Sequence, residues 1–231
     1  MKSIEEGAVE ALMFLTDKPK SAFINNWRPS SELSNDSSTL SFLTALRTKP
    51  FLLLAGISGT GKSQKVQELA FMSCPESLQD PTSTTPGNYC LVEVKPNWHD
   101  STELLGYYSA LSGKYELTKF IRFAYKAIKN PEYPFFLCLD EMNLAPVEQY
   151  FAEYLSVLET RKKTEEGIIT QPLLPKDNFS NCKLMGTEPK PKNGYTLDGD
   201  DYQLKPLYSP EDAEIITYLK ENGLQLPNNL F

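Results

Sequence analysis

A glycine-rich segment early in the chain has the composition and order of a phosphate-binding loop. It reads GISGTGKS from Gly56 to Ser63 and fits the pattern G-x-x-x-x-G-K-[ST]. In this pattern the glycines let backbone N–H groups converge on phosphate oxygens, the lysine reaches the β- and γ-phosphates, and the serine hydroxyl can ligate Mg²⁺. The sequence therefore predicts a phosphate site with Mg²⁺ bound by Ser63. The predicted phosphate-binding residues are Gly56, Ser58, Gly59, Thr60, Gly61, Lys62 and Ser63.

Two adjacent acids, Asp140 and Glu141, form a second candidate set. They directly follow the apolar residues 135–139, FFLCL. Successive side chains on a strand point to opposite faces, so one carboxylate can face a metal ion while the other faces another part of the site. Asp140 is predicted to bind Mg²⁺, Glu141 to polarise the attacking water, and Lys62 to neutralise developing charge. Taken alone, the pair could be a solvated strand end; combined with the phosphate loop, it favours catalysis.

Short apolar segments alternating with helical patterns must position these residues. Residues 51–55, FLLLA, are apolar throughout, as in a strand that is covered on both faces. Further strands are predicted at 89–94 and 135–139, and helices at 62–72, 117–129 and 147–161. Alternating strands and helices predict an α/β fold with a parallel sheet.

The outer parts of the chain divide it into regions. Residues 1–45 are predicted to be an N-terminal helix, over 4–15, followed by a polar linker, and 46–231 to be one domain. Residues 162–208 are rich in proline, lysine and glycine, which predicts an irregular insertion of hairpins and loops. Ser209 and Pro210 then begin a helix that Gly223 ends.

The composition excludes several classes of protein. The chain has 231 residues, a net charge of −7, four scattered cysteines and a single histidine, which argues against a Cys/His zinc site and predicts reduced thiols. It has no long apolar run and no signal-peptide pattern, which predicts a cytoplasmic protein without a membrane span. The acidic charge predicts that any DNA contact is local or made through an assembly.

Five single residues allow more than one interpretation. His99 is interpreted as a loop residue rather than part of a catalytic triad, because no serine lies in a G-x-S-x-G context. Trp98 is predicted to pack in the interior, whereas Tyr107 and Tyr108 could pack or line a pore or a subunit interface. Arg161 fits a helix C-terminus, although it could also face a neighbouring subunit's phosphates.

Three longer strings narrow the class further. They are VKPNWHDSTELLGYY at 94–108, LDEMNLA at 139–145 and YFAEYLSVLE at 150–159. Together with the phosphate loop they resemble the AAA+ motor of McrB-type proteins, the nucleotide-hydrolysing subunits of modification-dependent restriction systems. The resemblance covers about residues 46–161 and implies a P-loop NTPase core that uses Mg²⁺ and GTP. Most AAA+ relatives use ATP, and no residue here decides between ATP and GTP.

The resemblance also implies partners and missing parts. It implies a hexamer-like ring of identical subunits, a McrC-like nuclease subunit, and DNA contact only through the assembly. It further implies a sensor strand between the strands predicted at 51–55 and 135–139, an arginine finger and a helical lid. We expect this chain to lack these parts and the usual N-terminal DNA-reading domain, with 224–231 at most beginning the sensor strand. The chain alone is therefore expected to show little or no turnover.

Two alternatives stay open. The chain could be a nucleotide-binding but catalytically silent assembly or regulatory module, or a gene fragment. It could also be a chaperone-like ATPase related to MoxR or dynein, which would share the motor but lack a nuclease neighbour.

Overall fold

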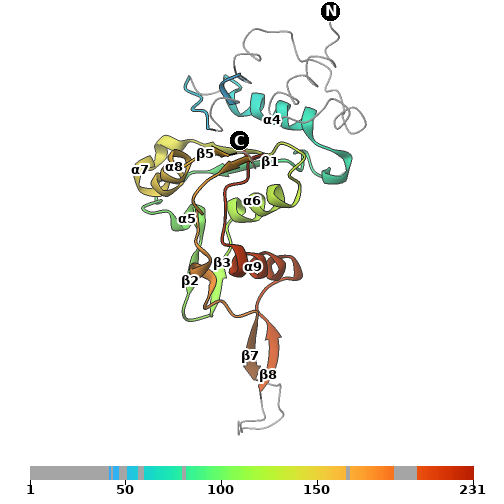
Figure 1. Ribbon diagram of the computed structural model, residues 1–231, viewed down its shortest axis with the longest axis vertical. Coiled ribbons are helices and arrows are strands. Elements are labelled where there is room, and N and C mark those ends of the chain that lie inside the picture. The colour runs from blue at the N-terminus through green and yellow to red at the C-terminus, as the bar shows by residue number, and fades with distance from the viewer. Residues whose placement is uncertain are drawn as a thin grey trace, which may run out of the picture. The chain divides into compact units, whose positions relative to one another are not determined.

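The computed structural model describes residues 42, 44–46, 51–56, 60–79, 82–164, 167–189 and 202–231 (Figure 1). The helix predicted at 4–15, the linker before residue 42, and Ser58 and Gly59 of the phosphate loop lie outside them. The chain forms two compact units. Unit 1 contains the described residues up to 97 together with 123–145 and 227–231, and unit 2 contains 98–122 and 146–226. None of the described helices is long and apolar enough to cross a membrane.

Unit 1 is built on a small parallel sheet. Strand β1 (Tyr89–Glu93) pairs in parallel with β4 (Phe136–Asp140), with Tyr89 opposite Phe136 and Glu93 opposite Asp140. These strands lie where the apolar runs at 89–94 and 135–139 predicted them. The structure is therefore mixed α/β with a parallel sheet, as expected.

The end of the chain covers the other edge of β4. The Leu137 N–H donates to the Phe231 carbonyl at 2.8 Å, and the Phe231 N–H donates to the Phe135 carbonyl at 2.9 Å. The Phe135 N–H donates to the Asn229 carbonyl at 2.8 Å, and the bridge between Phe135 and Leu230 is parallel. Residues 229–231 thus pair in parallel with this edge of β4 through a single bridge.

A single buried amide holds this tail in place. Asn229 Nδ2 lies within 2.8–3.1 Å of the carbonyl oxygens of Ala127, Asn130 and Tyr133. The first is in α6 (Lys119–Lys129) and the other two follow it. Because Asn229 is only 7% exposed, its amide would be costly to bury without these acceptors. The tail position is therefore specified by one side chain as well as by the ladder.

The strand predicted at residues 51–55 is not present, which corrects that prediction. The segment is assigned no strand, although its Leu52 packs against a buried cluster that contains Phe136. A strand needs a hydrogen-bonded neighbour, and the tail, which was the expected neighbour, runs beside β4 over residues 229–231 only. Apolar composition was therefore sufficient to bring this segment to the core but not to place it in the ladder.

Helix α4 (Lys62–Ser73) packs on β4 in this unit (Figure 1). Its Leu69 and Ala70 form a buried cluster with Leu46 and Phe136. Tyr89 and Phe231 pack against the same cluster, so the helix, the strand pair and the tail share one apolar core. After α4 the chain forms a short helix, η1 (Glu76–Leu78).

Unit 2 consists mainly of short helices and antiparallel hairpins. Its helices are α5 (Thr102–Leu105), α7 (Val147–Tyr150), α8 (Ala152–Glu159), η3 (Lys176–Phe179) and α9 (Pro210–Asn222). Its hairpins pair β2 (Tyr107–Ser109) with β3 (Lys114–Glu116), β5 (Lys162–Thr164) with β6 (Gly167–Ile169), and β7 (Met185–Pro189) with β8 (Tyr202–Pro206). Within the described parts of 162–208, the expected antiparallel strand pairs and loops are present.

Two helix predictions in unit 2 have different outcomes. The helix predicted at 147–161 is interrupted at Phe151, whose φ of −118° leaves the helical range. The break accompanies burial of the Phe151 ring, which stacks on Tyr154 at 4.6 Å between centroids. By contrast, α9 is capped as predicted: the Asp212 N–H donates to Ser209 Oγ at 3.1 Å, and Gly223 ends the helix at φ 68°.

Candidate phosphate and magnesium site

The N-terminus of α4 has the features of an anion site. Gly61 precedes the helix in the left-handed conformation, with φ 76° and ψ 19°, which glycine adopts without strain. No side chain caps this end, and no acid lies in the first turn. The first N–H groups of a helix carry partial positive charge and favour a negatively charged group such as a phosphate.

The decisive contact of the site joins the two candidate sets. Ser63 Oγ, at the start of α4, donates to Asp140 Oδ1 at 3.3 Å. The two residues are 77 positions apart in the sequence and both are partly buried. The phosphate-loop serine and the first acid of the pair therefore lie together, as their predicted roles require.

Lys62 lies close to the beginning of the loop. Its Nζ donates to the Gly56 carbonyl at 3.1 Å and is exposed. Gly56 has a φ of 155°. The lysine ammonium thus lies at Gly56, the first residue of the predicted phosphate loop.

Glu141 follows Asp140 in an unusual backbone conformation. Its φ of 53° and ψ of 43° are left-handed, and it is the one non-glycine residue with positive φ in the described part of the chain. The strand ends at Asp140, and Glu141 is exposed in the turn that follows. Strand alternation, which was the predicted reason for separating the two carboxylates, therefore does not apply to Glu141. Such a conformation costs about 1–3 kcal/mol and is concentrated at functional sites.

Two further residues at the site did not emerge from sequence reasoning. Cys138 precedes Asp140 by two positions on β4, so both point to the same face. Burial, above all, raises the pKa of Cys138, and the charge of Asp140 raises it further. The i, i+2 spacing on a predicted strand could have identified Cys138.

Tyr89 is the second of these residues and lies on β1, the strand that pairs with β4. It is partly buried against the core cluster at the start of β1. Burial raises its pKa well above the ordinary value, with Cys138 and then Asp140 as further causes. Its phenol therefore keeps its proton and remains a hydrogen-bond donor across the physiological pH range.

The oxygen atoms at this site suit Mg²⁺. That ion prefers oxygen ligands, keeps several waters, and is usually held by one or two carboxylates together with substrate phosphates. Ser63 Oγ and Asp140 Oδ1 are a hydroxyl and a carboxylate oxygen that already lie side by side. The donor set therefore fits the predicted Mg²⁺ site.

The other singled-out residues lie in unit 2 and have structural environments. Trp98 is buried edge-on against Tyr150, at 5.2 Å between ring centroids, which confirms its packing role. His99 is exposed in a loop, as predicted. The Tyr108 hydroxyl donates to the Asn181 carbonyl at 3.3 Å, and Arg161 has a pKa lowered by burial. Tyr107, in the same hairpin as Tyr108, is 52% exposed.

No protein-family model matches the chain, and no curated protein matches it.

Proposed function

We propose that this chain binds a nucleoside triphosphate with Mg²⁺ and hydrolyses it as an AAA+ motor of a restriction system. The contact that supports the proposal best is the hydrogen bond from Ser63 to Asp140. It joins a phosphate-loop serine to a strand-end carboxylate across 77 residues. Each motif alone has an ordinary explanation as a turn or a solvated strand end, but their convergence is what triphosphate hydrolysis requires.

The residues divide the chemistry among them. The backbone N–H groups at the start of α4 and of the loop at Gly56–Ser63 bind the phosphates, and Lys62 neutralises charge that develops on the β- and γ-phosphates. Ser63 and Asp140 would hold Mg²⁺, which would offset the negative charge of the phosphates. Glu141 accepts a hydrogen bond from the attacking water and orients it.

The wider setting follows from the resemblance to McrB-type motors. It supports a hexamer-like ring of identical subunits, a McrC-like nuclease partner, a cytoplasmic location, and DNA contact made only through the assembly. The nucleotide is ATP or GTP.

A second candidate is a module that binds nucleotide without hydrolysing it. It is favoured by residues 51–55, which precede the loop yet are not part of the ladder. A loop held by a helix alone could bind phosphates without aligning them for attack. Phosphate release over many turnovers that is lost in Lys62→Ala would support the enzyme, whereas binding without release would support the silent module. A chaperone-like ATPase related to MoxR or dynein would use the same residues, and a nuclease gene beside this one would argue against it.

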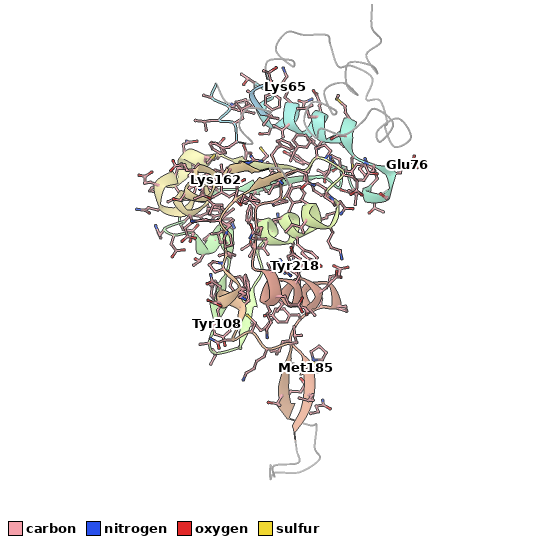
Figure 2. All side chains as sticks on the ribbon, in the orientation of Figure 1. Lys65, Glu76, Tyr108, Lys162, Met185 and Tyr218 are labelled. Atoms are coloured by element: carbon pink, nitrogen blue, oxygen red, sulfur yellow. The ribbon has the colours of Figure 1, made fainter. Side chains whose placement is uncertain are left out.

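Equilibrium binding of fluorescently labelled ATP and GTP, measured side by side with Mg²⁺, tests the proposal. We expect one or both to bind the parent chain, and Lys62→Ala to weaken binding at least about tenfold, since it removes a charge-assisted contact to phosphate. Lys65→Ala is the matched control, because Lys65 lies one turn further along the same helix (Figure 2). Equal affinity of the parent and Lys62→Ala would show that Gly56–Ser63 is not a phosphate loop.

A further inference from the structure

The end of β1 brings another acid to the candidate Mg²⁺ site. Glu93 is the last residue of β1 and lies opposite Asp140 in the parallel ladder. The pairing continues past these two residues, because the Val94 N–H donates to the Asp140 carbonyl at 3.1 Å. Neighbouring strands lie about 4.8 Å apart, so the backbones of the two acids are close together. The proposed function uses Asp140 and gives Glu93 no role.

Both acids lie on the sheet face against which α4 packs. Glu93 shares a face of β1 with Tyr89, four positions earlier. Asp140 likewise shares a face of β4 with Phe136. Tyr89 and Phe136 both pack in the apolar cluster that contains residues of α4, and Ser63 of the same helix donates to Asp140. Glu93 is therefore on the face and at the edge of the sheet that carry the predicted Mg²⁺ ligands.

The charges of the two carboxylates are not balanced by a neighbouring cation. Within the described part of the chain, neither Glu93 nor Asp140 forms an ion pair, and Glu93 is exposed. Like charges directly opposite each other on neighbouring strands destabilise a sheet. A cation bound at this edge would relieve the repulsion, so the pairing of these two acids favours a metal ion independently of the phosphate loop.

We propose that Glu93 is the second carboxylate of the Mg²⁺ site and accepts hydrogen bonds from water molecules that the ion retains. Mg²⁺ loses its waters reluctantly and is usually held by one or two carboxylates together with substrate phosphates. The described residues contain no group of three or more His, Cys, Asp or Glu side chains suited to a metal ion. With so few protein ligands, a carboxylate that orients the waters strengthens the site. This inference rests on the proposed function, because it concerns the same ion.

The charge of Glu93 is expected to act differently with and without Mg²⁺. When the ion is bound, Glu93→Gln removes a charged acceptor for its waters, so we expect the half-saturating Mg²⁺ concentration for nucleotide binding to rise about tenfold or more. Without the ion, the same substitution removes a negative charge near the triphosphate, which repels it. Affinity in EDTA is therefore expected to equal or exceed that of the parent chain.

The test titrates labelled ATP and GTP against the full chain over a range of Mg²⁺ concentrations and in EDTA. Glu132→Gln is the matched control, because Glu132 is exposed and precedes β4, at the opposite end of the strand from Asp140. It removes the same charge away from the site and is expected to leave the Mg²⁺ midpoint unchanged. Circular dichroism checks that both variants fold, as expected for substitutions of exposed side chains.

The outcomes distinguish this inference from the proposed function. An unchanged Mg²⁺ midpoint in Glu93→Gln, with parent binding that needs Mg²⁺ and Lys62, would overturn the role of Glu93 alone. An equal loss of affinity with Mg²⁺ and in EDTA would also overturn it, because that result would indicate a structural effect. So would an equal shift in Glu132→Gln, which would indicate a general effect of charge. Parent binding that needs neither Mg²⁺ nor Lys62 would overturn the proposed function and the inference together.

Discussion

The two halves of the candidate site are built in different ways. The acid half stands on β4, which has β1 on one edge and residues 229–231 on the other, with hydrogen bonds to both. The loop half is held by α4, whereas the preceding residues 51–55 lie outside the ladder. The two acids are thus placed by long-range pairing, and the described residues of the loop half by packing of the helix that follows them. The comparison shows that the residues after Gly61 can form their helix without the preceding apolar segment forming a strand.

The largest effect is expected from a change in the acid half that leaves binding intact. Glu141→Gln keeps the side-chain shape and leaves Asp140 to the metal, but it removes the charge that polarises water. In a preparation with measurable turnover, we expect hydrolysis to fall by about 100-fold or more while affinity for the Mg²⁺ nucleotide is retained. Phosphate release and equilibrium binding measure the two quantities separately. Unchanged turnover would remove Glu141 from the role of water-activating residue.

Hydrogen exchange tests the comparison of the two halves directly. The amides of Phe136 and Leu137 donate to the carbonyls of Asn88 and Phe231, each at 2.8 Å. Within the described part of the chain, no comparable ladder protects residues 52–54. We expect the β4 amides to exchange about 100-fold more slowly or slower still. Similar protection in both segments would mean that residues 51–55 are paired in solution, and the contrast between the halves would be lost.

The pairing of residues 229–231 with β4 is expected to depend on the side chain of Asn229. Asn229→Ala leaves the carbonyls of Ala127, Asn130 and Tyr133 without this donor, so we expect the free energy of unfolding to fall by about 1–3 kcal/mol. Chemical denaturation measures the change, with the exposed neighbour Asn228→Ala as control. A change no larger than that of the control would show that the tail contributes little to β4.

The smallest effect on the free energy of unfolding is expected at an ion pair in unit 2. Because this pair belongs to neither half of the candidate site, it serves as a reference for substitutions elsewhere. Arg122 Nε and Nη2 donate to the two oxygens of Asp212 at 2.8 and 3.0 Å, and the arginine side chain is 46% exposed. We expect Asp212→Asn to lower the free energy of unfolding by less than about 1 kcal/mol, as is usual for exposed pairs.

The pH dependence of that ion pair has a defined sign. The hydrogen bond from Arg122 holds the pKa of Asp212 below its ordinary value. The ion pair therefore makes its full contribution to the free energy of unfolding above the ordinary aspartate pKa. That contribution is lost as the pH falls through the ordinary pKa and then through the lower pKa of the folded state. Denaturation curves of parent and Asp212→Asn should differ at neutral pH and converge in acid. A difference that grows in acid would contradict the assignment.

Much of the fold could be predicted because its signals are local. The helix that begins after Gly61, the helix capped by Ser209 and Gly223, and the hairpins over 162–208 follow from capping residues, prolines and turn chemistry within a few positions. The buried strands β1 and β4 also follow from short apolar runs. The break at Phe151 does not, because it accompanies a ring contact with Tyr154 that no helical pattern reveals.

The sequence alone determined the residue types of the site and their order: a glycine-rich loop ending in Lys62 and Ser63, and an apolar strand ending in Asp140 and Glu141. Tertiary structure decided which of them meet. It brought Ser63 to Asp140, placed Cys138 on the strand face that carries Asp140, gave Glu141 a left-handed conformation, and left residues 51–55 out of the sheet. The physical reason is that strand pairing and side-chain hydrogen bonds depend on which partner occupies an edge or a face, and that partner is distant in the sequence.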